Sequence, residues 1–530
     1  MRSRAVIVAA MFGVALVSGG WLMQAGYDGA RSVNGTRARL FEEVLAHVEN
    51  FYVDTVAEDT LYRKAVDGML LELHDPHSVF LPPDRLAKLN ESTTGRYAGV
   101  GIQMDVRDGW ITVVAPLPGT PAQRAGILTG DRVVEIEGRS TRAWTADEAI
   151  KALRGAPGSS VHIVVERPGN SARLPFTLTR QEIRFHSVQH ALMMRDSIGY
   201  VDLTIFSENS DQELRAAVDS LRAKGMRALI FDLRGDPGGL LDQGVAVADL
   251  FLDPGQKIVS MHGRRREADH DFVDRFPQAW PQMPLVVLVD SGSASASEIV
   301  AGALQDHDRA LIVGTTSYGK GSAQSLFPLS DSSALKLTTA LWYTPSGRSI
   351  NRAHLSADDD DGGQDALRSL GAEAPRPVFK TDAGRAVLGG GGITPDVAVI
   401  DSVTDAQEAS LQLALGRHVA EFRDVLTDYA LALKARGSVS SPTFSITPTM
   451  RNELYERIRA KKIVLPRPTF DADWTLIDKL LGDQIARYVF GPDAEFERVM
   501  GRDRDITTAL GLLDRARTPQ ELLQAGSSKR

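Results

Sequence analysis

Three turns rich in glycine and hydroxyl side chains hold the residues of this chain that could do chemistry. They cover residues 232–239, 290–298 and 314–321, and each follows an apolar run that predicts a buried strand. In α/β sheets, catalytic groups gather at the carboxyl ends of strands, because backbone amides and side chains converge there on a rigid support. We therefore expect the three turns to contribute to one site.

The turn at 290–298 is the best candidate for a nucleophile. It reads Asp-Ser-Gly-Ser-Ala-Ser-Ala-Ser-Glu and leads into a predicted helix. A serine at such a place meets backbone N–H groups that have no helical partner, and the positive end of the helix dipole. This setting suits a nucleophile whose product is an oxyanion, although helix capping by serine explains the same pattern equally well.

A serine hydroxyl also needs a base to remove its proton, and that base is most often histidine. The histidine nearest in sequence is His307, at a helix end that we expect to face solvent. A lysine can replace histidine where burial lowers its pKa, because desolvation disfavours the ammonium form. Lys320, between two glycines and just after an apolar strand, is the best placed lysine.

Other chemistries fit the sequence less well. The segment 314–320 matches the start of a phosphate-binding loop, but Gly321 replaces the Ser or Thr that binds magnesium, and a strand is predicted next. His74 and His77 are typical of a turn, and the acidic run 358–361 lacks the first and last ligands of a calcium loop. We predict neither a metal nor a cofactor.

Two kinds of secondary-structure pattern surround these turns. Short β-branched runs at 110–115, 132–136, 161–166 and 174–178 predict four strands of a small strand-rich domain. One helix interrupts them, with a capping box formed by Thr145 and Glu148. Longer alternation from residue 198 to 400 predicts an α/β domain with strands at 228–233, 285–289 and 310–313. Ser210 and Glu213 form a second expected capping box there. The regions before and after read as helical.

Composition limits the class of protein. The 530 residues are 43% hydrophobic and carry a net charge of −8, which gives no reason to expect nucleic-acid binding. There is no cysteine, so disulfides, thiolate metal sites and cysteine nucleophiles are excluded. The length predicts several domains.

The N-terminus predicts export. Arg2 and Arg4 precede an uncharged stretch, residues 5–26, long enough to cross a bilayer. Basic residues before this stretch orient the rest of the chain away from the cytoplasm. We favour a retained membrane anchor over a cleaved signal peptide, and either places the chain on the periplasmic side of the inner membrane.

Residues 292–298 together with 314–324 closely resemble the C-terminal processing peptidases, or tail-specific proteases, which are S41-type serine peptidases with a PDZ domain. The resemblance implies that Ser295 is the nucleophile, that Lys320 is the base and that Gln324 orients the lysine. It also implies an oxyanion hole formed by backbone amides. The candidate donors are Ala296, Gly238 and Gly239.

The glycine-rich segment that opens the strand-rich domain resembles the carboxylate-binding loop of PDZ domains. Consecutive amides in such a turn can bind a terminal carboxylate while a strand edge and a helix hold the peptide. The residues concerned are Gly99, Val100, Gly101 and Ile102. A further element, GGGGI at 389–393, also resembles the family.

The resemblance implies a multidomain α/β protein with a ClpP/crotonase-like catalytic core, an inserted PDZ-like β-rich domain and flanking helical regions. The implied function is exported endopeptidase activity on proteins or peptides with accessible C-termini; the alternative is a catalytically silent PDZ scaffold that binds peptides. Self-association into a homo-oligomer is left open. The expected parts are 1–26 (anchor or signal), 36–92 (helical), 95–183 (PDZ), 184–400 (catalytic) and 401–530 (helical extension).

Overall fold

The computed structural model describes residues 36–168, 170–195, 197–352, 376–400 and 402–527. The expected membrane segment at 1–26 and the acidic run at 358–361 lie outside these ranges. Within them, no helix combines the length and the apolar character needed to cross a bilayer. The chain divides into two units, one formed by residues up to Pro83 with Gln324–Thr338 and the other by the remainder.

The smaller unit is built on the expected N-terminal helices. Residues 36–51 form a helix, α2 spans Glu58–Leu71, and the short strand β1 (Val79–Leu81) pairs antiparallel with the first residues of β18 (Ala334–Tyr343). In the turn before β1, Asp75 accepts hydrogen bonds from the Ser78 hydroxyl at 2.5 Å and the His77 amide at 3.1 Å. The histidine-containing segment is therefore a turn, as its sequence predicts.

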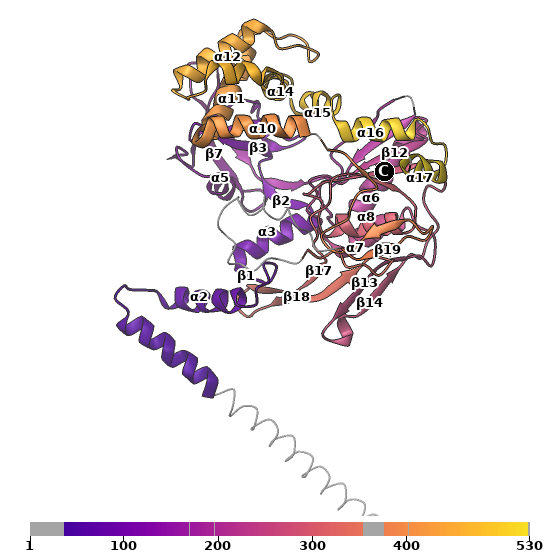
Figure 1. Cartoon of the computed structure of the whole chain (residues 1–530). Coiled ribbons are helices and arrows are strands. Elements are labelled where there is room, and N and C mark those ends of the chain that lie inside the picture. The colour runs from indigo at the N-terminus through magenta and orange to yellow at the C-terminus, as the bar shows by residue number, and fades with distance from the viewer. Residues whose placement is uncertain (1–35, 169, 196, 353–375, 401, 528–530) are drawn as a thin grey trace, which may run out of the picture. The chain divides into compact units, whose positions relative to one another are not determined.

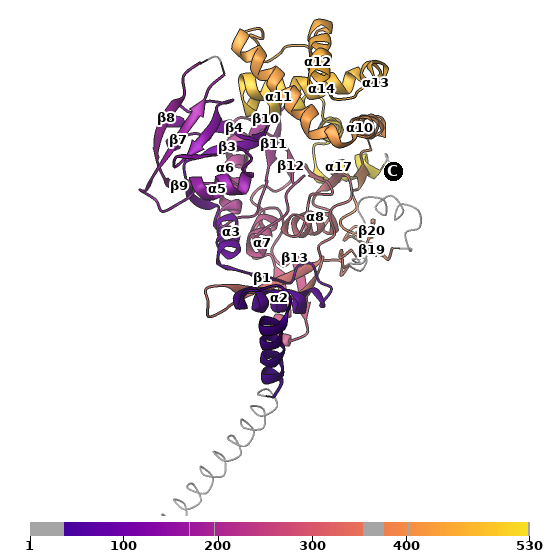
Figure 2. The same ribbon diagram turned by 90° about the vertical axis from the view of Figure 1, so that its left-hand side faces the viewer.

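In the larger unit, helix α3 (Pro83–Thr94) leads into the strand-rich domain (Figure 2). Its main sheet is antiparallel in the order β3-β4-β5-β7-β8, and α5 (Ala146–Leu153) begins at the predicted capping box, with Thr145 Oγ1 accepting from the Glu148 amide at 3.2 Å. The four predicted strands are confirmed as β4, β5, β7 and β8, with ends that differ by one residue at most. The strands are β2 (Arg96–Gly99), β3 (Ile102–Arg107), β4 (Trp110–Pro116), β5 (Arg132–Ile136), β6 (Arg139–Ser140), β7 (Ser160–Glu166), β8 (Leu174–Thr179) and β9 (Gln181–Arg184).

The α/β domain is built on a second sheet in the order β10-β11-β12-β15-β16-β21, parallel except for the edge strand β10. Its inner strands are fully buried, which explains their continuous apolar runs. The helices α6, α7 and α8 bury apolar side chains with one face of this sheet. The strands and helices of this domain are β10 (Ala191–Met193), β11 (Ile198–Asp202), α6 (Ser210–Ala223), β12 (Ala228–Asp232), α7 (Leu241–Asp249), β15 (Leu285–Val289), α8 (Ala296–Asp306), β16 (Leu311–Gly314) and β21 (Val397–Ala398).

The other face of the same sheet is covered by the end of the chain. Helix α16 (Arg504–Leu513) buries Ile506, Leu510 and Leu513 against β12, β15 and β16, and α17 (Pro519–Ser527) packs beside it (Figure 1). A sheet with two apolar faces needs a layer on each. The last helices therefore complete the core of the α/β domain.

The remaining C-terminal helices form a bundle with its own apolar core. The bundle also contacts the strand-rich domain: Lys461 pairs with Asp108 at 3.1 Å, Arg107 lies 3.5 Å from Asp424, and Lys434 Nζ donates to the Thr129 carbonyl at 3.1 Å. Its helices are α10 (Ser402–Leu415), α11 (Val419–Arg436), α12 (Pro448–Ala460), α13 (Arg467–Ala472), α14 (Trp474–Ile485) and α15 (Pro492–Met500).

The expected capping box at Ser210 and Glu213 is wrong. Ser210 is the first helical residue, and its buried hydroxyl accepts from the Ser207 amide at 2.8 Å. Glu213 accepts from the Ser187 amide at 2.7 Å. Glu213 therefore binds the amide of Ser187, which is distant in the chain, and does not bind the N-terminus of its own helix as the capping-box spacing predicts.

Smaller strands complete the larger unit. The end of β18 pairs antiparallel with β13 (Lys257–Gly263), which pairs with β14 (His270–Val273). β19 (Val378–Lys380) and β20 (Ala386–Leu388) form a separate hairpin.

Candidate active site

The three turns singled out in the sequence follow three neighbouring strands. β12, β15 and β16 are adjacent and parallel, so residues 233–239, 290–295 and 315–321 leave the sheet at the same edge. Hydrogen bonds join the turns directly: the Gly235 amide donates to Asp290 Oδ1 at 2.8 Å, and the Ala294 amide donates to the Asp236 carbonyl at 2.9 Å. The Tyr318 amide likewise donates to the Ser293 carbonyl at 3.0 Å, so the three turns lie together as expected, and their role as one catalytic site stays a prediction.

Ser295 occupies a backbone conformation that is rare for a residue with a side chain. It is the N-cap of α8, with φ 54° and ψ −111°, and it is partly exposed whereas its neighbours Ala294 and Ala296 are buried. Such strain costs on the order of 1–3 kcal/mol and persists where the surroundings over-determine it, most often at functional sites. The conformation resembles a nucleophile elbow, in which a sharp strand-to-helix turn exposes the serine.

A buried glutamate joins the serine turn to the lysine turn. One oxygen of Glu298 accepts from the backbone amides of Ser295 and Lys320, both at 2.9 Å. The other accepts from the Ser317 hydroxyl at 2.6 Å and the Gly319 amide at 2.7 Å. Because one oxygen accepts from both amides, the backbone nitrogens of Ser295 and Lys320 can be no farther apart than the sum of these two hydrogen-bond distances.

The charge state of Glu298 follows from these contacts. Burial raises its pKa, and the four hydrogen bonds oppose that shift. Three of the four donors are backbone amides, which can only donate, so the ionised carboxylate with its four acceptor positions matches the geometry. Glu298 was not among the expected functional residues, although its place three residues after an N-cap serine is the spacing of a capping box.

The two partners that the resemblance implies for the serine lie on the lysine turn and the strand after it. Lys320 is partly buried and lies two residues before β17 (Ser322–Pro328). Gln324 belongs to the smaller unit, where its amide donates to Thr338 Oγ1 at 3.2 Å. Their roles as base and orienting residue remain predictions.

The glycine-rich loop packs against the serine turn. Gly238 has φ 90°, and a Cβ on it would lie 2.8 Å from the Ala296 nitrogen and 2.9 Å from Ser295 Cβ, so only glycine fits. Its amide donates to Asp236 Oδ1 at 2.7 Å. Gly239 is exposed, with φ 154°. Of the two expected donors, Gly239 is therefore the better candidate for an oxyanion hole with Ala296, because the Gly238 amide already has an acceptor.

Asp236 is a second acidic residue that sequence reasoning missed. Its side chain is fully buried, and burial raises its pKa to about 8. One oxygen accepts from Gly238, whereas the other has no hydrogen-bond partner among the described residues. The backbone carbonyl of Asp236 accepts from the Ser297 hydroxyl at 3.0 Å. Asp236 thus forms hydrogen bonds with both the glycine-rich loop and the start of α8.

The expected peptide-binding loop joins β2 to β3 in the strand-rich domain. Gly99 ends β2, Val100 is buried and Ile102 begins β3. Gly101 has φ 77°, and a Cβ there would lie 2.3 Å from the Thr120 side chain. The loop is therefore tightly packed at the glycine, and its role in binding remains a prediction.

Two of the alternative chemistries conflict with the geometry. A strand, β17, follows Lys320 where a phosphate-binding loop requires a helix. His307 lies at the far end of α8, roughly 18 Å from Ser295 along the helix axis. In the part of the chain that the structure describes, no group of three or more His, Cys, Asp or Glu residues could hold a metal ion.

Comparison with known proteins decides the family. Residues 197–359 match the model of peptidase family S41, and residues 112–167 match that of a PDZ domain. A carboxy-terminal-processing protease of Bartonella bacilliformis is 39% identical over 322 residues, which cover 60% of this chain and 73% of that protein. The chain belongs to the carboxy-terminal processing proteases of peptidase family S41.

Two further proteins are similar to this chain in sequence. The carboxy-terminal processing protease CtpA of Bacillus subtilis is 32% identical over 58% of this chain and 65% of its own length. A solved structure of a photosystem II D1 C-terminal processing protease is 31% identical over 60% of this chain and 90% of its own, with a TM-score of 0.35. This carboxy-terminal processing protease is a serine-type endopeptidase, and the expected multidomain α/β fold with an inserted PDZ domain is confirmed.

Proposed function

We propose that this carboxy-terminal processing protease cuts peptide bonds with a dyad of Ser295 and Lys320. The observation that carries the proposal is the Glu298 carboxylate, which accepts from the amides of both residues at 2.9 Å. A single buried anion thereby fixes the backbone of the nucleophile relative to that of the base. Catalytic groups that must meet in one geometry need such support from rigid neighbours.

The proposed reaction proceeds in two halves. A neutral Lys320 amine takes the Ser295 hydroxyl proton as the oxygen attacks the scissile carbonyl, and the carbonyl oxygen becomes an oxyanion. Amides of Ala296 and Gly239 hold that charge, and loss of one such donor costs on the order of 100-fold in turnover. Collapse breaks the C–N bond as the ammonium returns its proton to the leaving amine. Water, activated by the same lysine, then hydrolyses the acyl-enzyme.

We also propose that the PDZ domain selects the substrate. A peptide would add as a strand along the domain edge, with its terminal carboxylate at the loop Gly99–Ile102. The substrates are then proteins or peptides with an accessible C-terminal tail. The names of the relatives, which describe carboxy-terminal processing, favour this substrate class.

The cleavage test uses matched variants. The full chain is incubated with an unfolded protein that carries an apolar C-terminus, and fragments are counted by mass spectrometry. Ser295→Ala and Lys320→Ala should each abolish cleavage, whereas Ser291→Ala, in the exposed part of the same turn, and Lys257→Ala, on β13, should cleave normally. Chelators should not inhibit. Binding without Ser295-dependent fragments would instead identify a peptide-binding scaffold.

Export is a separate proposal, supported by the basic residues Arg2 and Arg4 before an uncharged stretch of about 20 residues. The expected location is the periplasmic side of the inner membrane, and retention of the first 26 residues as an anchor is favoured. Mass spectrometry of the mature N-terminus and digestion of spheroplasts by added protease test it. A chain found only in the cytosolic fraction would contradict it.

A further inference from the structure

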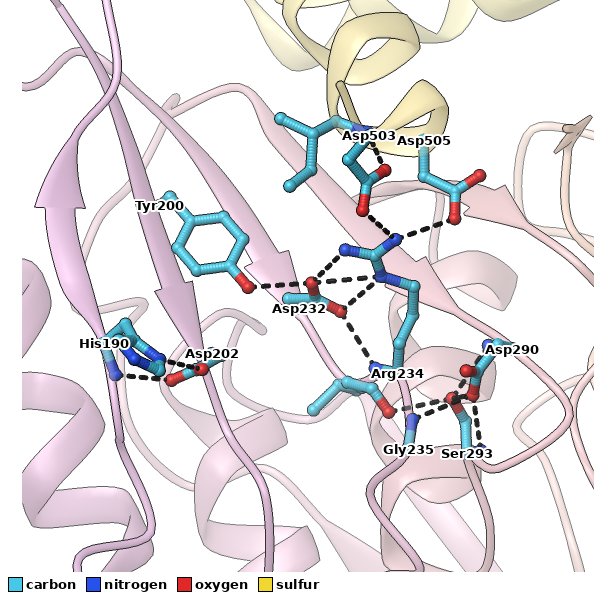
Figure 3. A network of polar contacts seen from close by, with 12 residues as sticks. His190, Tyr200, Asp202, Asp232, Arg234, Gly235, Asp290, Ser293, Asp503 and Asp505 are labelled. Carbon is cyan, nitrogen blue, oxygen red and sulfur yellow. Dashed lines mark hydrogen bonds and ion pairs between the residues drawn. The ribbon is translucent and has the colours of Figure 1, made fainter. Parts of the chain in front are cut away.

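Arg234 connects the glycine-rich loop of the site to the C-terminal helices (Figure 3). Its Nη2 donates to Asp232 Oδ2 at 2.6 Å, where β12 ends. Its Nη1 donates to Asp503 Oδ2 at 2.8 Å and to Asp505 Oδ2 at 2.9 Å. The two aspartates lie 269 and 271 residues later in the chain, at the start of α16.

Both aspartates are held firmly at the helix terminus. Asp503 is the N-cap of α16, and its other oxygen accepts from the Ile506 amide at 3.0 Å. Asp505 lies in the first turn, where a negative charge is stabilised by the helix dipole. Because α16 is anchored on the sheet by buried side chains such as Leu510 and Leu513, the two carboxylates are fixed relative to β12.

The contacts around Arg234 are largely shielded from water. The side chains of Arg234 and Asp505 are each 19% exposed, that of Asp503 is 15% exposed and that of Asp232 is 6% exposed. Burial opposes the charged guanidinium, but the hydrogen bonds and charges of Asp232 and Asp503 raise the pKa of Arg234 above its ordinary value. Charge-assisted hydrogen bonds in such surroundings are strong and directional.

The loop that begins at Arg234 is the loop that packs against Ser295. Its first part is tied to the serine turn through Gly235 and Asp236, as described above. Its last part is tied to residue 206: the Phe206 amide donates to the Gly238 carbonyl at 3.0 Å, and the Leu240 amide donates to the Phe206 carbonyl at 2.9 Å. Arg234 supplies the remaining anchor on the side of the C-terminal helices.

We propose that Asp503 and Asp505 are positioning residues for this loop, and that they hold the amides of residues 238–239 in place by fixing Arg234. The inference rests on the proposed peptidase function, because it concerns the oxyanion hole of that site. Both aspartates act through Arg234. The C-terminal helices are then part of the catalytic machinery as well as a layer of the core.

The test variant removes both contacts and keeps the helix cap. In Asp503→Ser/Asp505→Ala, the serine hydroxyl can still cap α16 but is too short to reach Arg234. The matched control is Asp514→Ala, which removes the ion pair with Arg195 at the other end of the same helix. A milder pair, Asp503→Asn/Asp505→Asn, keeps the cap and carbonyl acceptors, and should recover most of the lost activity.

Two measurements on the full chain give the answer. A misplacement of about 1 Å costs roughly 100-fold in rate, so we expect kcat of Asp503→Ser/Asp505→Ala to fall at least tenfold with KM nearly unchanged. Hydrogen–deuterium exchange should be faster at the amides of Gly235, Asp236 and Gly238, which are all hydrogen-bonded in the intact loop. Asp514→Ala should change neither quantity.

The outcomes separate this inference from the proposed function. Unchanged loop exchange in Asp503→Ser/Asp505→Ala, or a kcat equal to that of Asp514→Ala, overturns the inference. If the wild-type chain produced no Ser295-dependent fragments, the proposed function would fail, and loop exchange would still decide whether the two aspartates hold the loop.

Discussion

At the scale of single residues, the site depends on one carboxylate that faces only donors. Replacing Glu298 by Gln keeps the shape but turns an NH₂ group toward amides that need an acceptor. We predict that Glu298→Gln loses at least tenfold in kcat and about 1–3 kcal/mol of stability, because buried donors are left unsatisfied.

The control for this prediction is Glu148→Gln, at the exposed capping box of α5. Kinetics on a fluorogenic peptide and urea denaturation measure both effects. Normal kcat in Glu298→Gln would show that the dyad does not need this support.

Asp236 makes stability depend on pH in a direction that can be checked. Its pKa in the native state is raised to about 8, whereas an unfolded aspartate titrates near pH ~4. Between these values the native state binds more protons than the unfolded state, so the free energy of unfolding falls as pH rises. Asp236→Asn removes this group, and its stability relative to wild type should therefore rise from pH ~4 to pH ~8 and then level off.

Urea denaturation at several pH values measures that difference. The control is Asp331→Asn, because hydrogen bonds from Ser333 lower the pKa of that exposed aspartate. Its difference from wild type should change only at acid pH. A pH-independent difference for Asp236→Asn would contradict the account.

At the scale of elements, the last helices cover one face of the catalytic sheet. Leu513 of α16 is fully buried there, whereas Leu413 of α10 is 86% exposed. We predict that Leu513→Ala costs about 2–5 kcal/mol of stability, and that Leu413→Ala stays within about 0.5 kcal/mol. Equal losses, measured by chemical denaturation, would mean that α16 is not part of the core.

The same elements show what could be predicted from sequence. The buried strands Arg132–Ile136 and Leu285–Val289 have the predicted bounds, because apolar runs and turn residues are local signals. The capping box at Thr145 was predicted correctly for the same reason, since its two residues are close in the sequence. The predicted capping box at Ser210 was wrong because Glu213 accepts from the amide of Ser187, which is distant in the chain.

Long-range partners explain the rest of the difference. Residue types and predicted strand ends pointed to the serine and lysine turns, and the family resemblance assigned Ser295 as the nucleophile. Glu298 and Asp236 were missed because their roles depend on burial against other loops. Nothing in the sequence singled out Asp503 or Asp505. Their pairing with Arg234 arises only when α16 packs on the sheet.

At the scale of the whole molecule, the proposal joins a tail-binding domain to a cutting site. In Gly101→Ala, the added Cβ would collide with Thr120 in the expected carboxylate loop. We predict that the preference for a free C-terminal carboxylate over an amidated one, as a ratio of kcat/KM values, falls about tenfold. The rate of cleavage of a short peptide that lacks the C-terminal tail sequence should not change.

The matched control is Gly109→Ala. Gly109 has a similar φ of 72°, but a Cβ there would meet no atom closer than 4.0 Å. This variant bears the same backbone strain without the collision. If both variants lose the preference for a free C-terminal carboxylate to the same extent, or neither loses it, the loop at 99–102 does not bind that carboxylate.

The central claim is that Lys320 activates Ser295. A fluorophosphonate tests it directly, since attack by the serine oxygen forms a P–O bond, expels fluoride and leaves an adduct that peptide mass spectrometry can locate. The account predicts labelling at Ser295 at a rate that falls at least 100-fold in Lys320→Ala and is unchanged in Lys257→Ala. Labelling at another serine, or an unchanged rate in Lys320→Ala, would contradict it.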